Sequence, residues 1–333
     1  MDIQEVARLA KVSTATVSRV LNGSSKVRPI TAKRVQRVID ELNYVPNTSA
    51  RYLRAGRTKL FGLIVSDIRN PFFPDLIDRF EALSGNHGID MVFTHTNYDL
   101  KRLDHCLRRM VERNVDGIAV MTSEVELSAL ERVKRRKTPL VLLNQIELDK
   151  NFHNIHVDYS EGFEQAVRHL QALGHTRIGF LSGPAGLSSP QRRRSAFASK
   201  MKQCGLKVRE EFIATSTMDV EGGFAAMQEL LARPRRPTAV VCTNDLMALG
   251  AIQAAQKAQL SVPGDISIIG FDDLPLCRMF TPQLTTIALP REEIAESAFS
   301  ILLKASTPGS KVKIARHSIA TELKVRESTG PAK

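Results

Sequence analysis

The sequence is poor in the features that mark several common classes of protein. Its four cysteines are widely scattered and form no CxxC pair, so we expect reduced thiols and neither disulfides nor a metal site. No run of about 18 apolar residues is present, which argues against a membrane-spanning helix. The N-terminus lacks the charged and then apolar stretch of a signal peptide, so we expect a cytoplasmic protein.

Motifs of catalysis and phosphate binding are also missing. The chain contains no GxSxG and no HExxH motif, and no Ser/His/Asp set can be justified. The segment GPAGLSS (183–189) lacks the Gly-Lys-Ser/Thr ending of a phosphate-binding loop. We therefore expect neither enzyme activity nor a cofactor. The basic runs KRRK (134–137) and RPRRP (233–237) are explained more simply as a solvated helix end and a loop than as nucleic-acid patches.

The first 22 residues have the pattern of two short helices joined by a tight turn. Apolar residues recur at helical spacing from Ile3 to Ala10, and Ser13 is suited to cap a second helix that starts at Thr14. A second helix of this kind can enter the major groove of DNA. Its buried stripe would be Val17, Val20 and Leu21. Its outward side chains are small, polar or basic, as base edges and phosphates require: Thr14, Ala15, Thr16, Ser18, Arg19 and Asn22.

The alternative is that the two helices are simply part of a hydrophobic core. The net charge of this part of the sequence favours DNA binding over that alternative. Residues 1–60 hold twelve Lys and Arg against four Asp and Glu, which is a net charge of +8 out of +12 for the whole chain. A basic surface around a helix-turn-helix is what the neutralisation of DNA phosphates predicts. A third helix, expected over about 31–42, would pack on the first two.

From residue 60 the pattern changes to short β-rich runs that alternate with helical segments. Four strand–helix units precede residue 150 and four follow residue 176, which favours two similar lobes with parallel, doubly wound sheets. Ligands bind beyond the carboxyl ends of the strands in such sheets. The candidates for ligand contact are therefore the polar residues at strand ends: Ser66, Asp67, His95, Thr122, Ser123, Asn144, Gln145, Asn244, Asp245, Asp272 and Asp273.

The helix after the GPAGLSSP loop adds Arg193 to this group, and Phe73 offers a flat apolar face. Carboxylate, amide and guanidinium groups that converge on one cleft can hydrogen-bond the hydroxyls of a sugar in pairs. The same set also suits a nucleoside or a sugar acid, because arginine binds carboxylates as well.

Nearly the whole chain resembles the LacI/GalR (lactose repressor-like) family of bacterial transcriptional regulators. The segments that carry the resemblance, in family order, are VARLAKVSTATVSRVLNG, ELNYVPN (41–47), ARYLRAGRT (50–58), GFLSGP (179–184), CTNDLMALGA (242–251), ISIIGFDD (266–273) and PQLTTI (282–287). The resemblance implies an all-α helix-turn-helix headpiece (1–46), a hinge helix and linker (47–58), and a periplasmic-binding-protein-like α/β core of two doubly wound lobes (59–330). It also implies that the chain crosses between the lobes near 158–162, 288 and 318.

The resemblance also implies a function. It implies a repressor that binds double-stranded operator DNA as a homodimer. A small-molecule effector would control this binding, and we expect the effector to be a sugar or sugar derivative. The family's hinge contacts with DNA match Asn47, Ala50 and Leu53, with the leucine as an apolar wedge in the minor groove. The family's effector contacts match Ser66, Phe73, Asn144, Arg193, Asn244 and Asp272, although Asn144 replaces a commoner acid.

Simpler interpretations stay open for the protein and for single residues. The chain could be a ligand-binding module whose N-terminal helices only dimerise, or a sugar-processing enzyme, although it lacks a nucleophile or an acid/base pair. Leu53 could pack on its own domain as a linker residue, and Arg193 could be a solvated helix charge. Asn244 and Asp272 could cap the helix or turn that follows them. His175 is expected to be a helix C-terminal cap without a ligand.

Overall fold

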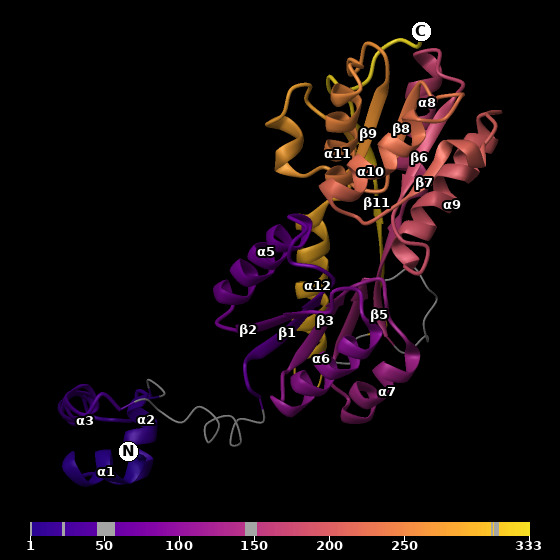
Figure 1. The fold of residues 1–333 in the computed structure, drawn as a ribbon. Helices are drawn as coiled ribbons and strands as arrows, with labels where there is room; N and C mark the ends of the chain where they lie inside the picture. Colours follow the sequence, from indigo (N-terminus) through magenta and orange to yellow (C-terminus); the bar gives the residue numbers. More distant parts are fainter. Residues whose placement is uncertain (1, 22–23, 45–56, 144–151, 308, 310–312) are drawn as a thin grey trace. The chain divides into compact units, whose positions relative to one another are not determined.

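The computed structural model describes residues 2–21, 24–44, 57–143, 152–307, 309 and 313–333. The chain divides into two compact units, Met1–Thr58 and Lys59–Lys333, which we call the headpiece unit and the core (Figure 1). The predictions made for Asn22, Asn47, Ala50, Leu53 and Asn144 fall outside the described residues.

The headpiece unit contains three helices, α1 (Ile3–Leu9), α2 (Thr14–Leu21) and α3 (Pro29–Glu41). The predicted cap is confirmed, because the Ser13 hydroxyl accepts the Thr16 backbone N–H at 3.2 Å. α3 starts two residues earlier than expected, at a proline whose fixed φ and missing N–H suit the first helical position. The three helices share a small core in which Val6, Ala10, Val17 and Val35 are fully buried.

The first lobe of the core is a six-stranded parallel sheet covered on both faces. Its strand order is β11-β5-β4-β3-β1-β2. The strands are β1 (Leu60–Val65), β2 (Asp90–His95), β3 (Gly117–Met121), β4 (Leu140–Leu143), β5 (His153–Asp158) and β11 (Arg316–Ala320). The helices are α5 (Phe72–Asn86), α6 (Leu100–Glu112), α7 (Leu127–Arg136) and α12 (Arg291–Ala305).

Alternation along the strands explains the two helical layers of this lobe. In β3, Ala119 and Met121 join the apolar cluster that contains α5 and α12, whereas Ile118 and Val120 join the cluster that contains α6 and α7. Successive side chains of a strand point to opposite faces, so a strand covered on both faces is apolar throughout.

The second lobe repeats this plan with the strand order β12-β10-β9-β8-β6-β7. Its strands are β6 (Ile178–Ser182), β7 (Ile213–Thr215), β8 (Ala239–Cys242), β9 (Ser267–Asp272), β10 (Thr285–Ala288) and β12 (Glu322–Lys324). β12 pairs antiparallel with β10, and the other pairs are parallel. The helices are α8 (Ser160–Ala172), α9 (Ser188–Gln203), α10 (Val220–Leu231) and α11 (Asp245–Lys257), with short 3-10 turns η1 (Glu210–Phe212) and η2 (Pro275–Arg278).

The chain passes between the lobes three times, as Figure 1 shows. The crossings lie between β5 and α8 at 158–160, between β10 and α12 at 288–291, and between β11 and β12 at 320–322. The first two crossings fall where the family resemblance implies, and the third lies about two residues later. Among the helices of the described ranges, none is long and apolar enough to cross a membrane.

Candidate functional site

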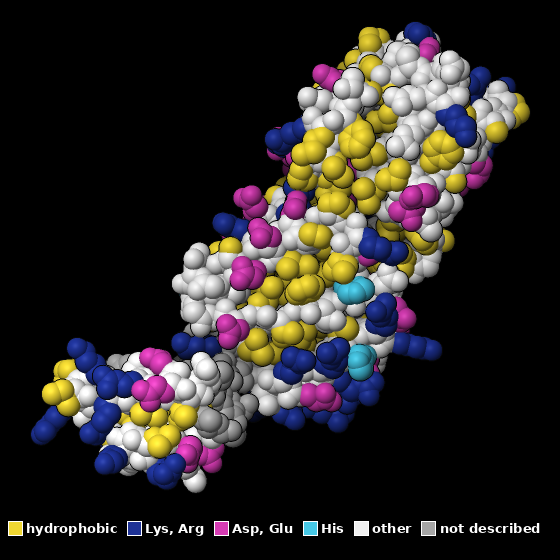
Figure 2. All heavy atoms as spheres, turned by 60° about the vertical axis from the view of Figure 1, so that its left-hand side comes forward, with side chains coloured by type: hydrophobic (Ala, Val, Ile, Leu, Met, Phe, Trp, Pro, Cys, Tyr) yellow, Lys and Arg dark blue, Asp and Glu magenta, His cyan; other side chains and the backbone are white. Residues whose placement is uncertain are grey.

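The outward face of α2 presents the side chains expected to meet DNA. Thr14, Ala15 and Arg19 are exposed, and Thr16 and Ser18 are half-buried. The Thr16 hydroxyl lies 3.0 Å from that of Ser13, so it is already engaged with the cap. Figure 2 shows Lys and Arg side chains distributed over the headpiece surface, which agrees with the charge excess of this part of the sequence.

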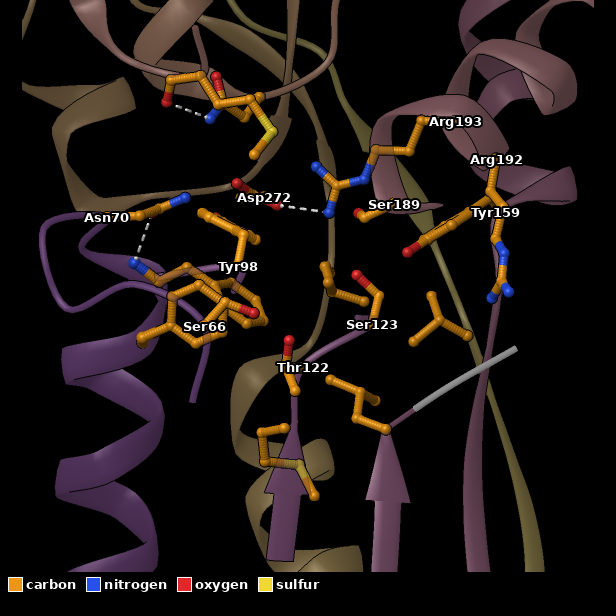
Figure 3. Close-up of a pocket in the computed structure, with 18 residues that line it drawn as sticks. Ser66, Asn70, Tyr98, Thr122, Ser123, Tyr159, Ser189, Arg192, Arg193 and Asp272 are labelled. Carbon is orange, nitrogen blue, oxygen red and sulfur yellow. Dashed lines mark hydrogen bonds and ion pairs between the residues drawn. The ribbon is translucent and has the colours of Figure 1, made fainter. Parts of the chain in front are cut away.

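A pocket lies between the two lobes, beyond the carboxyl ends of their strands (Figure 3). It contains about 720 Å³ of space, part of which is open to solvent. Five of the six predicted effector residues line it, namely Ser66, Phe73, Arg193, Asn244 and Asp272. Ten others matter most for its shape and polarity: Asn70, Phe72, Tyr98, Met121, Thr122, Ser123, Tyr159, Ser189, Arg192 and Met218.

Arg193 and Asp272 form a buried ion pair in the wall of this pocket. Arg193 Nη2 lies 3.1 Å from Asp272 Oδ1, and Arg193 Nη1 donates to the Thr243 carbonyl at 2.6 Å. The guanidinium also lies 3.9 Å from the centre of the Phe271 ring. Arg193 is only 8% exposed, so its interpretation as a solvated helix charge is wrong. Its buried Nε has no hydrogen-bond partner in the part of the chain that the structure describes.

Asp272 carries two unfavourable features: its carboxyl is buried, and its backbone has a positive φ angle. Burial raises the pKa of this carboxyl to about 7, although the positive charges of Arg193 and Arg291 act in the opposite direction. The φ angles of Asp272 and Asp273 are +118° and +54°, values that residues other than glycine rarely adopt. Arg291 Nη1 donates to both of their carbonyl oxygens, at 2.8 and 3.0 Å, and so holds this turn. Such strain is typical of functional sites.

Asn244 caps the helix that follows it, which is the simpler of the two interpretations of this residue. Its Oδ1 accepts the Met247 backbone N–H at 2.9 Å and caps α11. Its Nδ2 donates to the Met218 carbonyl at 2.9 Å. Both the oxygen and the nitrogen of the amide are thus engaged within the protein, and Asn244 mainly shapes the pocket wall.

Two neighbouring carboxylates hold the loop that carries Asp272 and do not line the pocket. Asp245 is fully buried, and burial raises its pKa. It accepts the Thr286 hydroxyl at 2.5 Å and the Leu274 N–H at 2.8 Å. Asp273 Oδ1 pairs with Arg326 at 2.5 Å. Among the other strand-end candidates, Asp67 pairs with Arg69, Nη2 to Oδ2 at 2.9 Å.

The sequence did not single out several residues of the pocket and its rim. Asn70 accepts the Phe72 N–H at 3.0 Å, and Figure 3 shows its amide nitrogen directed toward Asp272. Glu124, in the first lobe, accepts the Ser188 backbone N–H at 2.9 Å and the Ser188 hydroxyl at 2.8 Å. Ser188 starts α9 of the second lobe, so these bonds join the lobes at the pocket rim. No local sequence pattern predicts a contact of this kind.

Two family models match the chain. "Bacterial regulatory proteins, lacI family" matches residues 2–47, and "Periplasmic binding protein-like domain" matches residues 167–329. The ribose operon repressor of Escherichia coli (strain K12) is 35% identical over 302 residues, which is 90% of this chain and 92% of that protein. The transcriptional repressor CytR of the same strain is 34% identical over 327 residues, covering 98% of this chain and 96% of CytR.

Solved structures show the same likeness. The lac repressor dimer bound to operator and the anti-inducer ONPF has a TM-score of 0.86 and 25% identity, and covers 99% of each chain. A LacI family transcriptional regulator from Enterococcus faecium with bound ribose has a TM-score of 0.72 and 27% identity, over 82% of this chain and 100% of the other.

Proposed function

Because this chain belongs to the lacI family of bacterial regulatory proteins, we propose how its parts divide the work of such a regulator. The protein is a DNA-binding transcriptional repressor and not an enzyme. We assign operator recognition to the headpiece (1–46), a DNA-dependent hinge to 47–58, and effector binding and dimerisation to the core (59–330). It binds double-stranded operator DNA as a homodimer. Because the DNA of a bacterium lies in its cytoplasm, we propose the cytoplasm as its site of action.

We propose that α2 reads the operator in the major groove. The contact residues would be Thr14, Ala15, Thr16, Ser18 and Arg19, together with Asn22, Asn47, Ala50 and Leu53 outside the described residues. The exposure of Thr14, Ala15 and Arg19 supports this assignment. Arg19 is the one residue of the face that can form a bidentate contact with guanine, and Ala15 can only offer apolar contact, for instance to a thymine methyl.

We propose that the pocket between the lobes binds the effector, a sugar or sugar derivative. The contact residues would be Ser66, Phe73, Arg193, Asn244 and Asp272, with Asn144 outside the described residues. The observation that carries this proposal is the buried Arg193–Asp272 pair, in which Arg193 Nε has no hydrogen-bond partner among the described residues. A buried donor without a partner is costly, so a ligand hydroxyl that accepts from it gains affinity.

Effector binding would control operator binding by shifting the balance between two arrangements of the lobes. A ligand that touches both lobes binds better where they are closed over it, and so favours that arrangement. The chain enters the first lobe at Lys59, where the Lys59 N–H bonds Asp116 Oδ2 at 2.8 Å, so a movement of this lobe is passed to the linker.

Operator binding by the Arg19→Ala variant tests the DNA assignment. We expect a loss of about 1–3 kcal/mol on a pseudo-palindromic operator and a relaxed preference at one base pair of each half-site. Arg8→Ala is the matched control, because Arg8 lies on α1 and pairs with Glu5 at 2.6 Å. It should weaken binding slightly and equally on all sequences. Unchanged affinity and unchanged preference in Arg19→Ala would refute the assignment.

A further inference from the structure

A second cavity lies beside the pocket, also between the lobes. It contains about 1600 Å³ of space, much of it open, and is lined from both lobes, for example by Asp67, Arg69 and Asn97 and by Leu187, Thr217 and Asp219. Three residues line both this cavity and the pocket, namely Asn70, Tyr98 and Met218. These three side chains therefore form the partition between the two spaces. Tyr98 supplies its one aromatic ring, from the first lobe, and Met218 belongs to the second lobe.

The backbone of Tyr98 shows that this ring is held in place at a cost. Tyr98 has φ +61° and follows Asn97 at φ +53°. Bulky side chains rarely adopt this region, whereas asparagine and glycine tolerate it. Bonds on both sides of Tyr98 fix the turn. The Asn97 N–H donates to the Ser66 carbonyl at 2.7 Å, Arg69 Nη2 donates to Asn97 Oδ1 at 2.9 Å, and the Asp99 N–H donates to the Thr96 carbonyl at 3.2 Å. A strained residue that surrounding bonds hold beside a ligand pocket is a candidate for function.

The surroundings of the ring also set its chemistry. Burial is the main influence on the Tyr98 hydroxyl and raises its pKa, and the charges of Asp67 and Asp272 act in the same direction. The hydroxyl therefore stays protonated and can donate a hydrogen bond. The groups suited to sugar hydroxyls, above all Arg193 and Asp272, lie on the pocket side of the partition. Beyond it the second cavity is lined by Asp67, Asp99, Asp219 and Glu221.

We infer that Tyr98 is a specificity-determining residue that limits the effector to a single sugar ring. Its ring and Met218 close the pocket on the side where a second ring would extend, whether that ring is the base of a nucleoside or the second unit of a disaccharide. This inference rests on the proposed function, because it takes the pocket as the effector site. Removal of the ring joins the two spaces and leaves the Arg193–Asp272 pair in place.

Two substitutions separate the ring from its hydroxyl group. Tyr98→Asn removes the ring and introduces a residue that tolerates positive φ, so the fold is retained. Tyr98→Phe keeps the ring and removes the hydroxyl. Lys137→Asn is the matched control, because Lys137 has φ +55° and is exposed at the end of α7, outside both cavities.

The experiment measures calorimetric affinities of the full chain for paired probes, D-ribose with cytidine and D-glucose with cellobiose. The wild type should bind one of these two pairs. Within that pair, we expect its affinity for the one-ring probe to be roughly tenfold or more higher than for the two-ring probe. Tyr98→Asn should reduce that preference at least roughly tenfold, chiefly by gaining affinity for the two-ring probe. Tyr98→Phe and Lys137→Asn should keep the wild-type preference.

Two results overturn the inference and leave the proposed function standing. One is a wild type that binds the two-ring probe as tightly as its one-ring partner, and the other is a Tyr98→Asn variant with the wild-type preference. If none of the four probes binds either protein, the assignment of the pocket to sugars fails, and the inference fails with it.

Discussion

The two lobes of the core share one strand order, because β11-β5-β4-β3-β1-β2 corresponds strand by strand to β12-β10-β9-β8-β6-β7. Yet they contribute different chemistry to the pocket between them. Among the described residues, the charged side chains that line it, Arg192, Arg193 and Asp272, all belong to the second lobe. The described residues of the first lobe supply hydroxyls, the amide of Asn70 and aromatic rings, as Ser66 and Phe73 do. Topology therefore places the site, and the residues at the strand ends decide what each lobe does there.

This division suggests an order of events. Charge-assisted hydrogen bonds are roughly twice as strong as neutral ones, so the second lobe should hold the ligand first and orient it. We then expect the first lobe to close over it with weaker, neutral contacts. Glu124 and Ser188 join the lobes at the pocket rim, so we expect that contact to belong to the closed arrangement. Each prediction below tests this asymmetry between the lobes.

The largest expected effect comes from the ion pair of the second lobe. Arg193→Ala leaves the buried carboxyl of Asp272 without its partner and should cost the ligand about 2–5 kcal/mol. Ser66→Ala, a change in the first lobe, removes one neutral hydrogen bond and should cost about 0.5–1.5 kcal/mol. Calorimetric titration with the sugar identified in a thermal-shift screen measures both. Operator affinity without ligand should be unchanged in both variants.

Equal losses from Arg193→Ala and Ser66→Ala would contradict the asymmetry. If Arg193→Ala still responds at wild-type ligand concentrations, the effector binds elsewhere. Asp272→Ala should behave like Arg193→Ala, since each leaves the other charge buried and unpaired.

A smaller effect is expected at the contact that joins the lobes. Glu124→Ala leaves the Ser188 N–H without its acceptor at the start of α9, while the Ser188 hydroxyl keeps the Ser123 carbonyl at 2.9 Å, and should weaken ligand binding by about 1–3 kcal/mol. Glu126→Ala is the control, because Glu126 is exposed two residues further on and accepts the Ser128 hydroxyl, within its own helix end, at 3.3 Å. Titration calorimetry gives the affinities. A Glu124→Ala protein with wild-type affinity would show that the rim contact does not favour closure.

Local sequence patterns predicted what depends on neighbours in the chain. The Ser13 cap, the buried Val17 and the alternation of strands and helices follow from spacing and side-chain chemistry, and the structure agrees. The meeting of Arg193 with Asp272, 79 positions apart, was expected from strand ends together with family resemblance. Periodicity alone placed the start of α3 too late, because it ignored the preference of proline for the first turn.

Residues whose role depends on the other lobe could not be predicted. Tyr98 follows a strand without any motif, and the bond from Ser188 to Glu124 spans 64 positions and two lobes. His175 was expected to cap α8, and its backbone N–H does bond the Leu170 carbonyl at 3.0 Å. Its imidazole instead reaches the C-terminal segment, with Nε2 3.0 Å from the Gly330 carbonyl oxygen. Only the folded arrangement reveals that contact.

A still smaller effect concerns the protonation of Asp272. Burial raises the pKa of this carboxyl to about 7, so the acidic form gains population as the pH falls from about 8 to about 6. If the ligand hydroxyls donate to the carboxylate, affinity should fall over this range by about 1.4 kcal/mol in total. Calorimetry at both pH values measures the change. Asp272→Asn should bind more weakly and lose the pH dependence, and a persistent slope in that variant would assign the titration to another group.

The smallest effect compares two buried histidines, one in each lobe, that hold the returning C-terminal chain. His153 Nδ1 accepts the Ala315 N–H at 2.9 Å in the first lobe, and His175 contacts Thr238, Ser267 and Gly330 in the second. Burial lowers the pKa of both imidazoles. The folded state therefore takes up fewer protons than the unfolded state, and the stability that the neutral rings contribute is present above about pH 6.5 and lost as the pH falls below it.

Protonation of the two imidazoles should not cost the fold the same free energy of unfolding. A proton on His153 Nδ1 removes the acceptor of the Ala315 N–H, whereas protonated His175 can still donate to Thr238 and Gly330. We therefore expect His153 to contribute about 1 kcal/mol of acid destabilisation and His175 less. Urea midpoints at about pH 7.5 and about pH 5.5 measure this. His153→Asn keeps an acceptor near the Nδ1 position and His175→Gln keeps a donor near Nε2, so neither titrates. His153→Asn should flatten the pH dependence more than His175→Gln, and the reverse order would place the acid-sensitive contact in the second lobe.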